Sequence, residues 1–204
     1  MFGQGGSIRV TDVTGESERE WVRRARDGDQ IAFGRLVAAY QNPVYNLAYR
    51  MLGNADEAEE AAQETFLRVY IKFHTYDPQR SFRSWMLSIA SHYCIDRLRR
   101  RRIAWLSFKD EIAETGGLAE RLVSASPHPE STVVQHEREE QIQRLLMTLS
   151  PTDRAALTLL YWYDHSYEEI AEVLNLTVSA VKSRLFRARR ALAEKMQGEV
   201  GYAM

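Results

Sequence analysis

The chain has 204 residues, of which 45% are hydrophobic and 27% are charged, and its formal net charge is -1. This length fits one large domain or two small ones, and the apolar content is enough to build cores. A single cysteine, Cys94, excludes an internal disulfide and a cysteine-based zinc cage. The sequence has no long apolar run and no signal-peptide core, so we expect a soluble, cytoplasmic protein without direct membrane insertion.

The N-terminal part of the chain predicts a short disordered tail followed by amphipathic helices. Residues 1–17 are rich in Gly, Ser and Thr and are expected to be disordered. The tetrapeptide that begins at Ser17 resembles a capping box, which predicts the start of a helix. Asp29 is expected to cap the next helix. Pro43 fits the first turn of another helix, which we expect to end at Met51.

Two longer helices and an irregular segment are predicted next. Apolar residues recur at helical spacing over residues 55–73 and again over residues 82–102. Residues 74–81, with their turn-forming Asp and Pro, separate the two helices as a loop. Residues 104–133 contain scattered Gly, Ser and Pro without a sustained period. They are therefore predicted to be a linker.

The C-terminal part predicts a second helical unit over residues 134–198, followed by a short tail over 199–204. Its helices are expected over 134–149 and 151–163, before the segment 166–190. We find no strand-like alternation and no internal repeat. The expected fold is therefore all-α, with two small helical domains, 18–103 and 134–198, joined by an irregular linker.

Residues 166–190 predict a helix-turn-helix. Asn175 follows the last apolar position of the first helix and tolerates the left-handed backbone that ends a helix, while Thr177 can cap the second. The buried stripe of the second helix is expected to contain Val181, Leu185, Ala188 and Leu192. Its outer face then carries Lys182, Ser183, Phe186, Arg187, Arg189 and Arg190. Apolar stripes are usually just core, and arginine-rich faces are usually just solvated. The small Ala171, which allows a close helix crossing, favours a helix that enters a DNA major groove.

Opposite charges are segregated along the chain, so local fields matter more than the net charge. One predicted helix carries an acidic stretch of Asp56, Glu57, Glu59, Glu60 and Glu64, and the next ends in a basic block of Arg97, Arg99, Arg100, Arg101 and Arg102. The last helix is basic again. Two basic surfaces indicate phosphate contacts, and the acidic one indicates a positively charged protein partner.

Several motifs in this order resemble an extracytoplasmic-function sigma factor of bacterial RNA polymerase. They are residues 49–54, 61–70, 84–90 and 96–100 in the first unit, and 149–151, 169–174 and 181–189 in the second. The resemblance implies a promoter-recognition subunit with a sigma-two helical bundle, a linker and a sigma-four helix-turn-helix domain. It implies core RNA polymerase and promoter DNA as partners, an anti-sigma factor as regulator, and a monomer when free.

The resemblance assigns the acidic helix to the segment that docks on the coiled coil of the largest polymerase subunit. The implied contact face consists of Asp56, Glu59, Glu60, Gln63 and Glu64. A merely solvated helix face is the alternative. The absence of a basic residue within this stretch of sequence favours docking.

The loop and helix that begin at Tyr76 correspond to the part that opens DNA at the minus-ten element. Unstacked bases need aromatic faces and phosphate-neutralising cations. The implied residues are Tyr76, Arg80, Ser81, Phe82, Arg83, Trp85, His92, Arg97, Arg99 and Arg100. Trp85 fits a core position equally well. His92 stands where many relatives carry Asn, which changes the base contact implied there.

The second domain is implied to read the minus-thirty-five element. Lys182, Ser183, Phe186 and Arg187 lie on one helical face and align with base-reading positions. The cations that are implied to hold phosphates are Arg184, Arg189 and Arg190. Asn175 replaces the more usual turn glycine, and Ser179 with Ala180 replaces the common Gly-Thr, so the first turn is expected to meet DNA differently.

We expect no metal, no cofactor and no enzyme activity. The five histidines lack the paired helical spacing of a metal site, and no phosphate-binding glycine loop or nucleophile elbow occurs. The chief alternative function is a dimeric helix-turn-helix regulator that binds an operator without polymerase. A structural or nuclease-like nucleic-acid protein is less favoured, because no metal-binding carboxylate set is visible.

Overall fold

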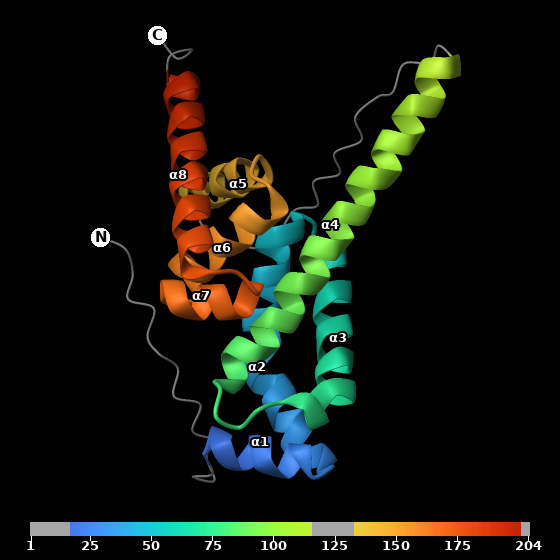
Figure 1. The fold of residues 1–204 in the computed structure, drawn as a ribbon, viewed down its shortest axis with the longest axis vertical. Coiled ribbons are helices and arrows are strands. Elements are labelled where there is room, and N and C mark those ends of the chain that lie inside the picture. Colours follow the sequence, from blue (N-terminus) through green and yellow to red (C-terminus); the bar gives the residue numbers. More distant parts are fainter. Residues whose placement is uncertain (1–16, 116–132, 201–204) are drawn as a thin grey trace.

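The computed structural model describes residues 17–115 and 133–200, and all regular secondary structure in these ranges is helical (Figure 1). The predicted all-α class is confirmed. The elements in chain order are α1 (Glu18–Arg26), α2 (Gln30–Leu52), α3 (Ala55–Lys72), the 3-10 helix η1 (Phe73–Thr75), α4 (Phe82–Thr115), α5 (Val133–Met147), α6 (Pro151–Trp162), α7 (Tyr167–Leu174) and α8 (Val178–Val200).

The first domain is a bundle in which α2, α3 and α4 pack on one another and α1 packs on α2 (Figure 1). Apolar side chains from all four helices form its core. Its largest fully buried side chains are Leu36, Leu47, Met51, Met86 and Leu87. This rigid bundle positions the exposed faces of α3 and α4 and the loop between them.

The helix starts agree only partly with the sequence-based expectations. Asp29 caps α2, because its carboxylate accepts hydrogen bonds from the backbone N–H groups of Ile31 at 2.8 Å and Ala32 at 3.1 Å. The predicted helix start at Ser17 is confirmed, since Ser17 is the N-cap residue of α1, but the capping box was a wrong prediction, because the Ser17 hydroxyl makes no capping bond. The carboxylate of Glu20, which would have completed the box, instead accepts from Arg23 at 2.6 Å.

Pro43 does not begin a helix, contrary to the prediction, but lies within the continuous helix α2. A proline inside a helix removes one backbone hydrogen bond. Burial compensates for this loss, because Tyr40 and Val44 on either side belong to the core. Tertiary packing therefore carries the helix through a position where the local sequence indicates a break.

The predicted linker 104–133 was wrong over its first part, because α4 continues without interruption to Thr115. Beyond the bundle this helix exposes a row of apolar side chains, with Trp105 52% and Phe108 55% accessible to solvent. Linker residues 116–132 lie outside the described residues, as do the predicted tail residues 1–16 and 201–204, while Val133 is already the first residue of α5. The other two residues of the predicted C-terminal tail, 199 and 200, belong to α8.

The second domain consists of α5 to α8 and contains the predicted helix-turn-helix in α7 and α8. Ser166 and Glu169 form a reciprocal capping box at the start of α7. Asn175 ends α7 in the left-handed conformation, with φ 53°, and the Thr177 hydroxyl accepts from the backbone N–H of Ala180 at 3.1 Å. These turn assignments confirm the expectations for Asn175 and Thr177.

The two domains pack directly against each other. Helices α2 and α4 of the first domain contact α6 and α7 of the second, and α5 contacts α2. The far ends of α4 and α8 extend from the same end of the molecule, on either side of α5 (Figure 1). Within residues 17–115 and 133–200, no helix combines the length and apolar character needed to cross a membrane.

Candidate DNA-binding and protein-binding surfaces

The outer face of α8 presents the predicted base-reading side chains together. Val181, Leu185 and Ala188 are at most 1% exposed and hold α8 against the domain. On the opposite face Lys182, Ser183, Phe186 and Arg187 are all exposed, and Phe186 is 67% accessible. Helical geometry thus separates a packing stripe from a face that is free to contact a groove.

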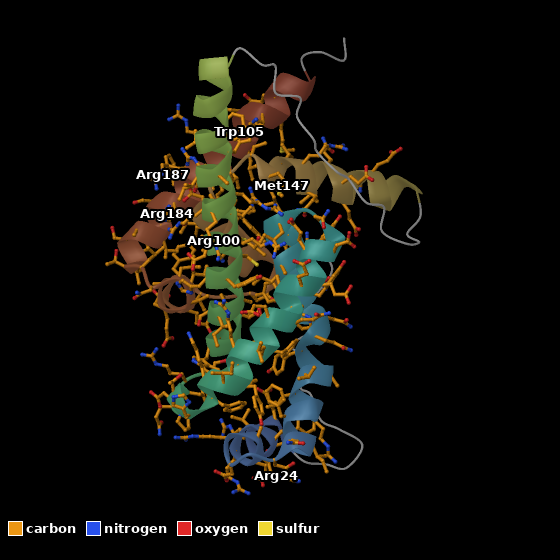
Figure 2. The ribbon with its side chains drawn as sticks, turned by 90° about the vertical axis from the view of Figure 1, so that its right-hand side faces the viewer. Arg24, Arg100, Trp105, Met147, Arg184 and Arg187 are labelled. Atoms are coloured by element: carbon orange, nitrogen blue, oxygen red, sulfur yellow. The ribbon has the colours of Figure 1, made fainter. Side chains whose placement is uncertain are left out.

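The cations that flank this face are oriented by neighbours within the same domain. Arg184, labelled in Figure 2, donates to the carboxylate of Asp153 on α6, and the two atoms are 2.8 Å apart. Arg189 donates to the Tyr161 hydroxyl at 3.0 Å, and Arg190 pairs with Glu194 one turn further along α8 at 2.8 Å. Such side chains suit backbone contacts, because Arg184 and Arg189 flank the face that carries Phe186 and Arg187, and Arg190 lies one turn beyond these two residues on α8.

The aromatic residues predicted for the minus-ten element form a packed cluster at the start of α4. Tyr76 and Phe82 are 6% and 4% exposed, while Trp85 is partly buried beside them. The rings of Phe82 and Phe73 are stacked with centroids 5.5 Å apart, and Tyr76 meets Phe82 edge-on at 5.5 Å. In this arrangement the rings of Tyr76 and Phe82 support the loop from inside and are not presented to solvent.

The loop itself carries the exposed polar groups. The Tyr76 hydroxyl donates to the carbonyl of Arg80 at 2.6 Å, which ties the loop to the cluster. Arg80 and Ser81 are exposed at its surface, and an open hollow of about 1460 Å³ separates them from α1. Arginines from both sides of this hollow line it, namely Arg19, Arg23, Arg26 and Arg80. The lining also contains the carboxylates of Glu18 and Asp27, so the hollow carries charges of both signs with arginines in excess.

The remaining residues predicted for minus-ten DNA lie along α4 and do not share one environment. His92 is exposed and its Nδ1 lies 2.8 Å from the Ser88 carbonyl oxygen, while Arg99 and Arg100 are exposed further along the helix (Figure 2 labels Arg100). Arg97 is different, because its side chain is only 25% exposed and turns toward α3.

The exposed face of α3 holds the predicted docking residues. Asp56, Glu59 and Gln63 are exposed, and the Gln63 amide donates to Glu59 at 3.3 Å. The stretch nevertheless has basic partners that the sequence did not indicate. Glu60 accepts from Arg97 at 2.8 Å, Glu64 accepts from Arg68 at 2.7 Å, and Glu57 contacts both Arg97 and Arg101.

Sequence reasoning missed the residues that join the two domains. The Ser84 hydroxyl on α4 lies 3.3 Å from Nε2 of His165, and both side chains are buried. The Tyr163 hydroxyl donates to the Pro43 carbonyl at 2.5 Å, and the Gln143 amide donates to the Tyr49 carbonyl at 3.0 Å. Burial lowers the pKa of His165. No local pattern marks these residues, because their partners are distant in sequence.

Arg154 is the most buried cation of this junction, at 4% exposure. Its guanidinium donates to the carbonyl of Met51 at the end of α2 and to those of Met147 and Leu149, the latter two at 3.0 and 3.2 Å. Burial lowers the pKa of Arg154 to about 10. One side chain therefore satisfies carbonyl groups from both domains, including ones that a helix end leaves unpaired.

Comparison with known proteins decides the family. Residues 36–103 match the family Sigma-70 region 2, and residues 139–192 match Sigma-70, region 4. The chain is 36% identical over 178 residues to the ECF RNA polymerase sigma factor SigW of Bacillus subtilis, which covers 86% of this chain and 95% of SigW. The chain belongs to the ECF RNA polymerase sigma factors.

Further similarities agree with this assignment. The sigma factor is 31% identical over 189 residues to the RNA polymerase sigma-H factor of Pseudomonas aeruginosa, across 91% of this chain and 96% of that protein. Its structure matches that of CnrH in complex with the cytosolic domain of CnrY at 25% identity and a TM-score of 0.64, covering 89% of this chain and 97% of CnrH. The alignment therefore extends over both domains.

The predicted family is confirmed, and with it the general function. As a sigma factor, the chain directs core RNA polymerase to promoters and acts in transcription initiation. A dimeric regulator that binds an operator without polymerase is not favoured. The matched segments lie within the two helical domains and contain α3, the start of α4 and the outer face of α8.

Proposed function

We propose that the two domains of this sigma factor divide promoter recognition between them. The first domain, residues 18–103, docks on core polymerase and opens the minus-ten element, and the second, residues 134–198, reads the minus-thirty-five element. The observation that carries this proposal is the outer face of α8, where four side chains capable of base contact stand opposite a fully buried stripe. A helix of this kind can enter a major groove only by that face.

Specific roles follow from the chemistry of the α8 side chains. Arg187 or Lys182 bonds guanine, which presents two acceptors in the major groove, and Phe186 contacts a thymine methyl group. Ser183 lies on the same face and is available for a polar base contact. The flanking cations bind phosphates and set the register of the helix, a role for Arg184, Arg189 and Arg190.

For the minus-ten element we assign the exposed loop residues and the cations of α4 to DNA contact. Arg80, Ser81 and Arg83 surround the entrance to α4, with His92, Arg99 and Arg100 further along the helix. The buried rings of Tyr76 and Phe82 act by keeping the loop in shape, and the partly exposed Trp85 is the ring available for stacking on an extruded base. Base stacking on an aromatic ring contributes about 1–3 kcal/mol.

The acidic face of α3 is assigned to docking on core polymerase. Asp56, Glu59 and Gln63 are exposed together, and Glu60 is still 62% accessible although it pairs with Arg97. Glu64 completes this face. A positively charged coiled coil of the polymerase is the partner that matches these carboxylates, because complementary charge accelerates and orients association.

We also propose that an anti-sigma factor controls this chain. Many members of the family it resembles are held inactive in that way, and the similar CnrH was solved in complex with the cytosolic domain of CnrY. The chain is further proposed to be monomeric when free, to act in the cytoplasm, and to have no catalytic activity, metal or cofactor of its own. Polymerisation of nucleotides belongs to the partner enzyme.

The experiment that tests the function is promoter-directed transcription. The purified chain is added to sigma-free bacterial core polymerase on fragmented genomic DNA, and the transcript starts are mapped. We expect discrete starts that share two spaced upstream motifs. A lack of starts, combined with tight binding of the chain alone to a palindromic operator, would contradict the proposal and support the dimeric regulator.

A further inference from the structure

Three arginines form a row along α1, the short helix at the start of the first domain. Arg19, Arg23 and Arg26 are all exposed, and their spacing of four and then three residues places them on one face of the helix. The segment that matches Sigma-70 region 2 begins only at residue 36. The arginine row therefore lies outside the part of the chain that the family model describes.

The packing of α1 on α2 fixes the direction in which this row points. Trp21 and Ala25 are 2% and 6% exposed and hold another face of α1 in the core. Val22, which is also buried, lines the hollow between α1 and the loop that precedes α4 (Figure 1). The arginine row lines this hollow from the side of α1, and Arg80 and Ser81 line it from the side of the loop.

The carboxylates of α1 and its C-cap leave the two ends of the row unpaired. Arg23 in the middle pairs with Glu20 at 2.6 Å and lies 3.6 Å from Asp27. Across residues 17–115 and 133–200, Arg19 and Arg26 have no ion pair. An exposed guanidinium suits a phosphate, because its planar fork donates two parallel hydrogen bonds to the oxygens of the anion.

The shape and chemistry of the hollow suit the backbone of one DNA strand. Arg19 and Arg26 are about 10 Å apart along the helix axis, at 1.5 Å per residue. A strand with phosphates every 3.4 Å or so of B-form length spans that distance in a few nucleotides. The rings of Tyr76 and Phe82 line the hollow but are 6% and 4% exposed, so the hollow offers cations and no open face for stacking. Such a surface holds the backbone without reading bases.

We propose that α1 is a further DNA-contact element of the first domain, whose arginine row binds phosphates of the separated strand at the minus-ten element. The row continues the surface of Arg80 and Ser81 across the hollow. The inference rests on the proposed function, since it concerns the strand that the same domain is proposed to open. Because phosphates carry no sequence information, the row strengthens binding to different promoters alike.

The test uses paired substitutions in the full chain that leave every assigned DNA residue intact. Arg19→Gln with Arg26→Gln removes the two unpaired charges and keeps Arg23 with its carboxylates. Arg19→Lys with Arg26→Lys retains both charges. The matched control is Arg138→Gln with Arg144→Gln, which removes two exposed arginines from α5 in the second domain and so corrects for the general loss of positive charge.

The first measurement is binding of the polymerase holoenzyme to a pre-opened promoter at several salt concentrations. The fragment carries a promoter mapped by its transcript starts, with mismatched bases across the minus-ten element. For the glutamine pair we expect roughly tenfold weaker binding at low salt. The fall of the logarithm of the binding constant with the logarithm of salt should be shallower by about 1.4, or about 0.7 for each lost contact to a single strand. The lysine pair and the α5 control should keep the wild-type salt dependence.

The second measurement locates the strand. An iron chelate attached to Ser17→Cys, an exposed position that lines the hollow, releases hydroxyl radicals that cut nearby backbones. The natural Cys94 is buried, so the wild-type chain treated in the same way gives the background. We expect cuts in the separated strand of the pre-opened promoter, and we expect the glutamine pair to remove them.

The outcomes separate this inference from the proposed function. If the glutamine pair has the salt dependence of the α5 control, or if the radicals cut polymerase and not DNA, α1 is not a DNA-contact element. Transcript starts from the wild-type holoenzyme would then leave the proposed function standing.

If the wild-type holoenzyme yields no transcript starts, the same variants are compared as free full-length chains on a short single-stranded oligonucleotide. A shallower salt dependence for the glutamine pair alone would retain the row as a single-strand site while the sigma assignment of the first domain fails. Equal salt dependence for wild type, the glutamine pair and the control would overturn the inference.

Discussion

Arg97 on α4 donates to the carboxylate of Glu60 on α3 at 2.8 Å, so one ion pair joins a residue assigned to DNA with a residue assigned to polymerase. Arg97 also lies 3.6 Å from Glu57, and its side chain is 25% exposed. The acidic and basic segments of the sequence therefore meet in the folded bundle. The face proposed for polymerase docking and the helix proposed for DNA contact are adjacent because α3 and α4 pack side by side.

Glu60→Gln tests the docking role of this pair. We expect weaker binding to core polymerase but a change in the free energy of unfolding of less than about 1 kcal/mol, because Glu60 is largely exposed and solvent screens the pair. Fluorescence titration with core polymerase and urea unfolding measure the two quantities. Glu168→Gln on α7 is the control and should leave polymerase binding unchanged. A large loss of stability with normal docking would assign Glu60 a structural role instead.

Because the buried His165 has a lowered pKa, we expect the chain to lose stability in mild acid. Burial lowers its pKa in the folded chain below the ordinary value of 6.5, and nearby Arg83 acts in the same direction, against the opposing effects of the Tyr163 carbonyl, Glu169 and Asp164. Just below pH 6.5 the unfolded chain therefore binds a proton at His165 that the folded chain does not bind. The contribution of neutral His165 to the free energy of unfolding is complete above pH 6.5 and is lost as the pH falls through the lowered pKa.

Urea unfolding of wild type and His165→Gln over a pH series from neutral to mildly acidic measures this effect. The variant should show a shallower loss of stability with falling pH than wild type. Replacing the exposed His74 by Gln serves as the control and should retain the wild-type slope. Identical slopes for wild type and His165→Gln would show that His165 does not titrate in this window.

Arg154→Leu should destabilise the chain by about 2–4 kcal/mol, because the carbonyl groups of Met51, Met147 and Leu149 lose a buried donor. Arg154→Lys should recover only part of this loss, since an ammonium group lacks the forked geometry that reaches several carbonyls at once. The free energy of unfolding in urea is the measurement. If Arg154→Lys had the wild-type free energy of unfolding, the positive charge alone, and not the forked geometry of the guanidinium, would stabilise the contact between the domains.

Phe82→Ala should cost about 3–5 kcal/mol of stability, as expected for the loss of a buried ring, whereas Phe82→Leu should cost less. Phe82 packs on Phe73 and Tyr76 and is 4% exposed. The free energy of unfolding in urea and the extent of promoter opening are measured for both variants. If Phe82→Ala leaves stability intact but abolishes promoter opening, the ring acts directly on DNA.

Arg187 and Arg190 on α8 should affect transcription in different ways. Arg187→Ala should cost about 1–3 kcal/mol of DNA-binding free energy and relax the base preference in the minus-thirty-five element. Arg190→Ala should weaken binding to all DNA sequences similarly, and it should reduce by about 1 the steepness with which the logarithm of the binding constant falls with the logarithm of the salt concentration. Binding of the polymerase holoenzyme to a promoter library at several salt concentrations distinguishes the two. Arg187→Lys retains the charge, so it should keep the salt slope but lose the bidentate contact.

The helix-turn-helix could be predicted in detail because its signals are local. The spacing of Val181, Leu185 and Ala188 alone separates the buried stripe of α8 from its outer face, and Asn175 marks the turn. The expected cap at Thr177 is likewise local, since its hydroxyl accepts from the backbone N–H of Ala180 three residues later. Each of these features depends on residues within one or two helical turns.

The features of the first domain that the sequence did not reveal have the opposite origin, because they depend on residues distant in the chain. Pro43 indicates a helix start locally, yet α2 continues through it because its neighbours are buried in a core assembled from several helices. Tyr76 and Phe82 suit base stacking by composition, and only the folded chain places them inside an aromatic cluster. The missed end of α4 shows that scattered charge without apolar periodicity does not exclude a helix.

The sequence by itself determined the helical content, the exposed outer face of α8 and the family, since periodicity, caps and motif order act over short stretches of chain. Only the tertiary structure decided which charges pair and how the domains meet. Ser84 and His165 are 81 positions apart, Arg80 and Glu172 lie in different domains, and Arg154 reaches a helix end formed about a hundred residues earlier. Such partners are selected by the packing of whole helices, which no local pattern records.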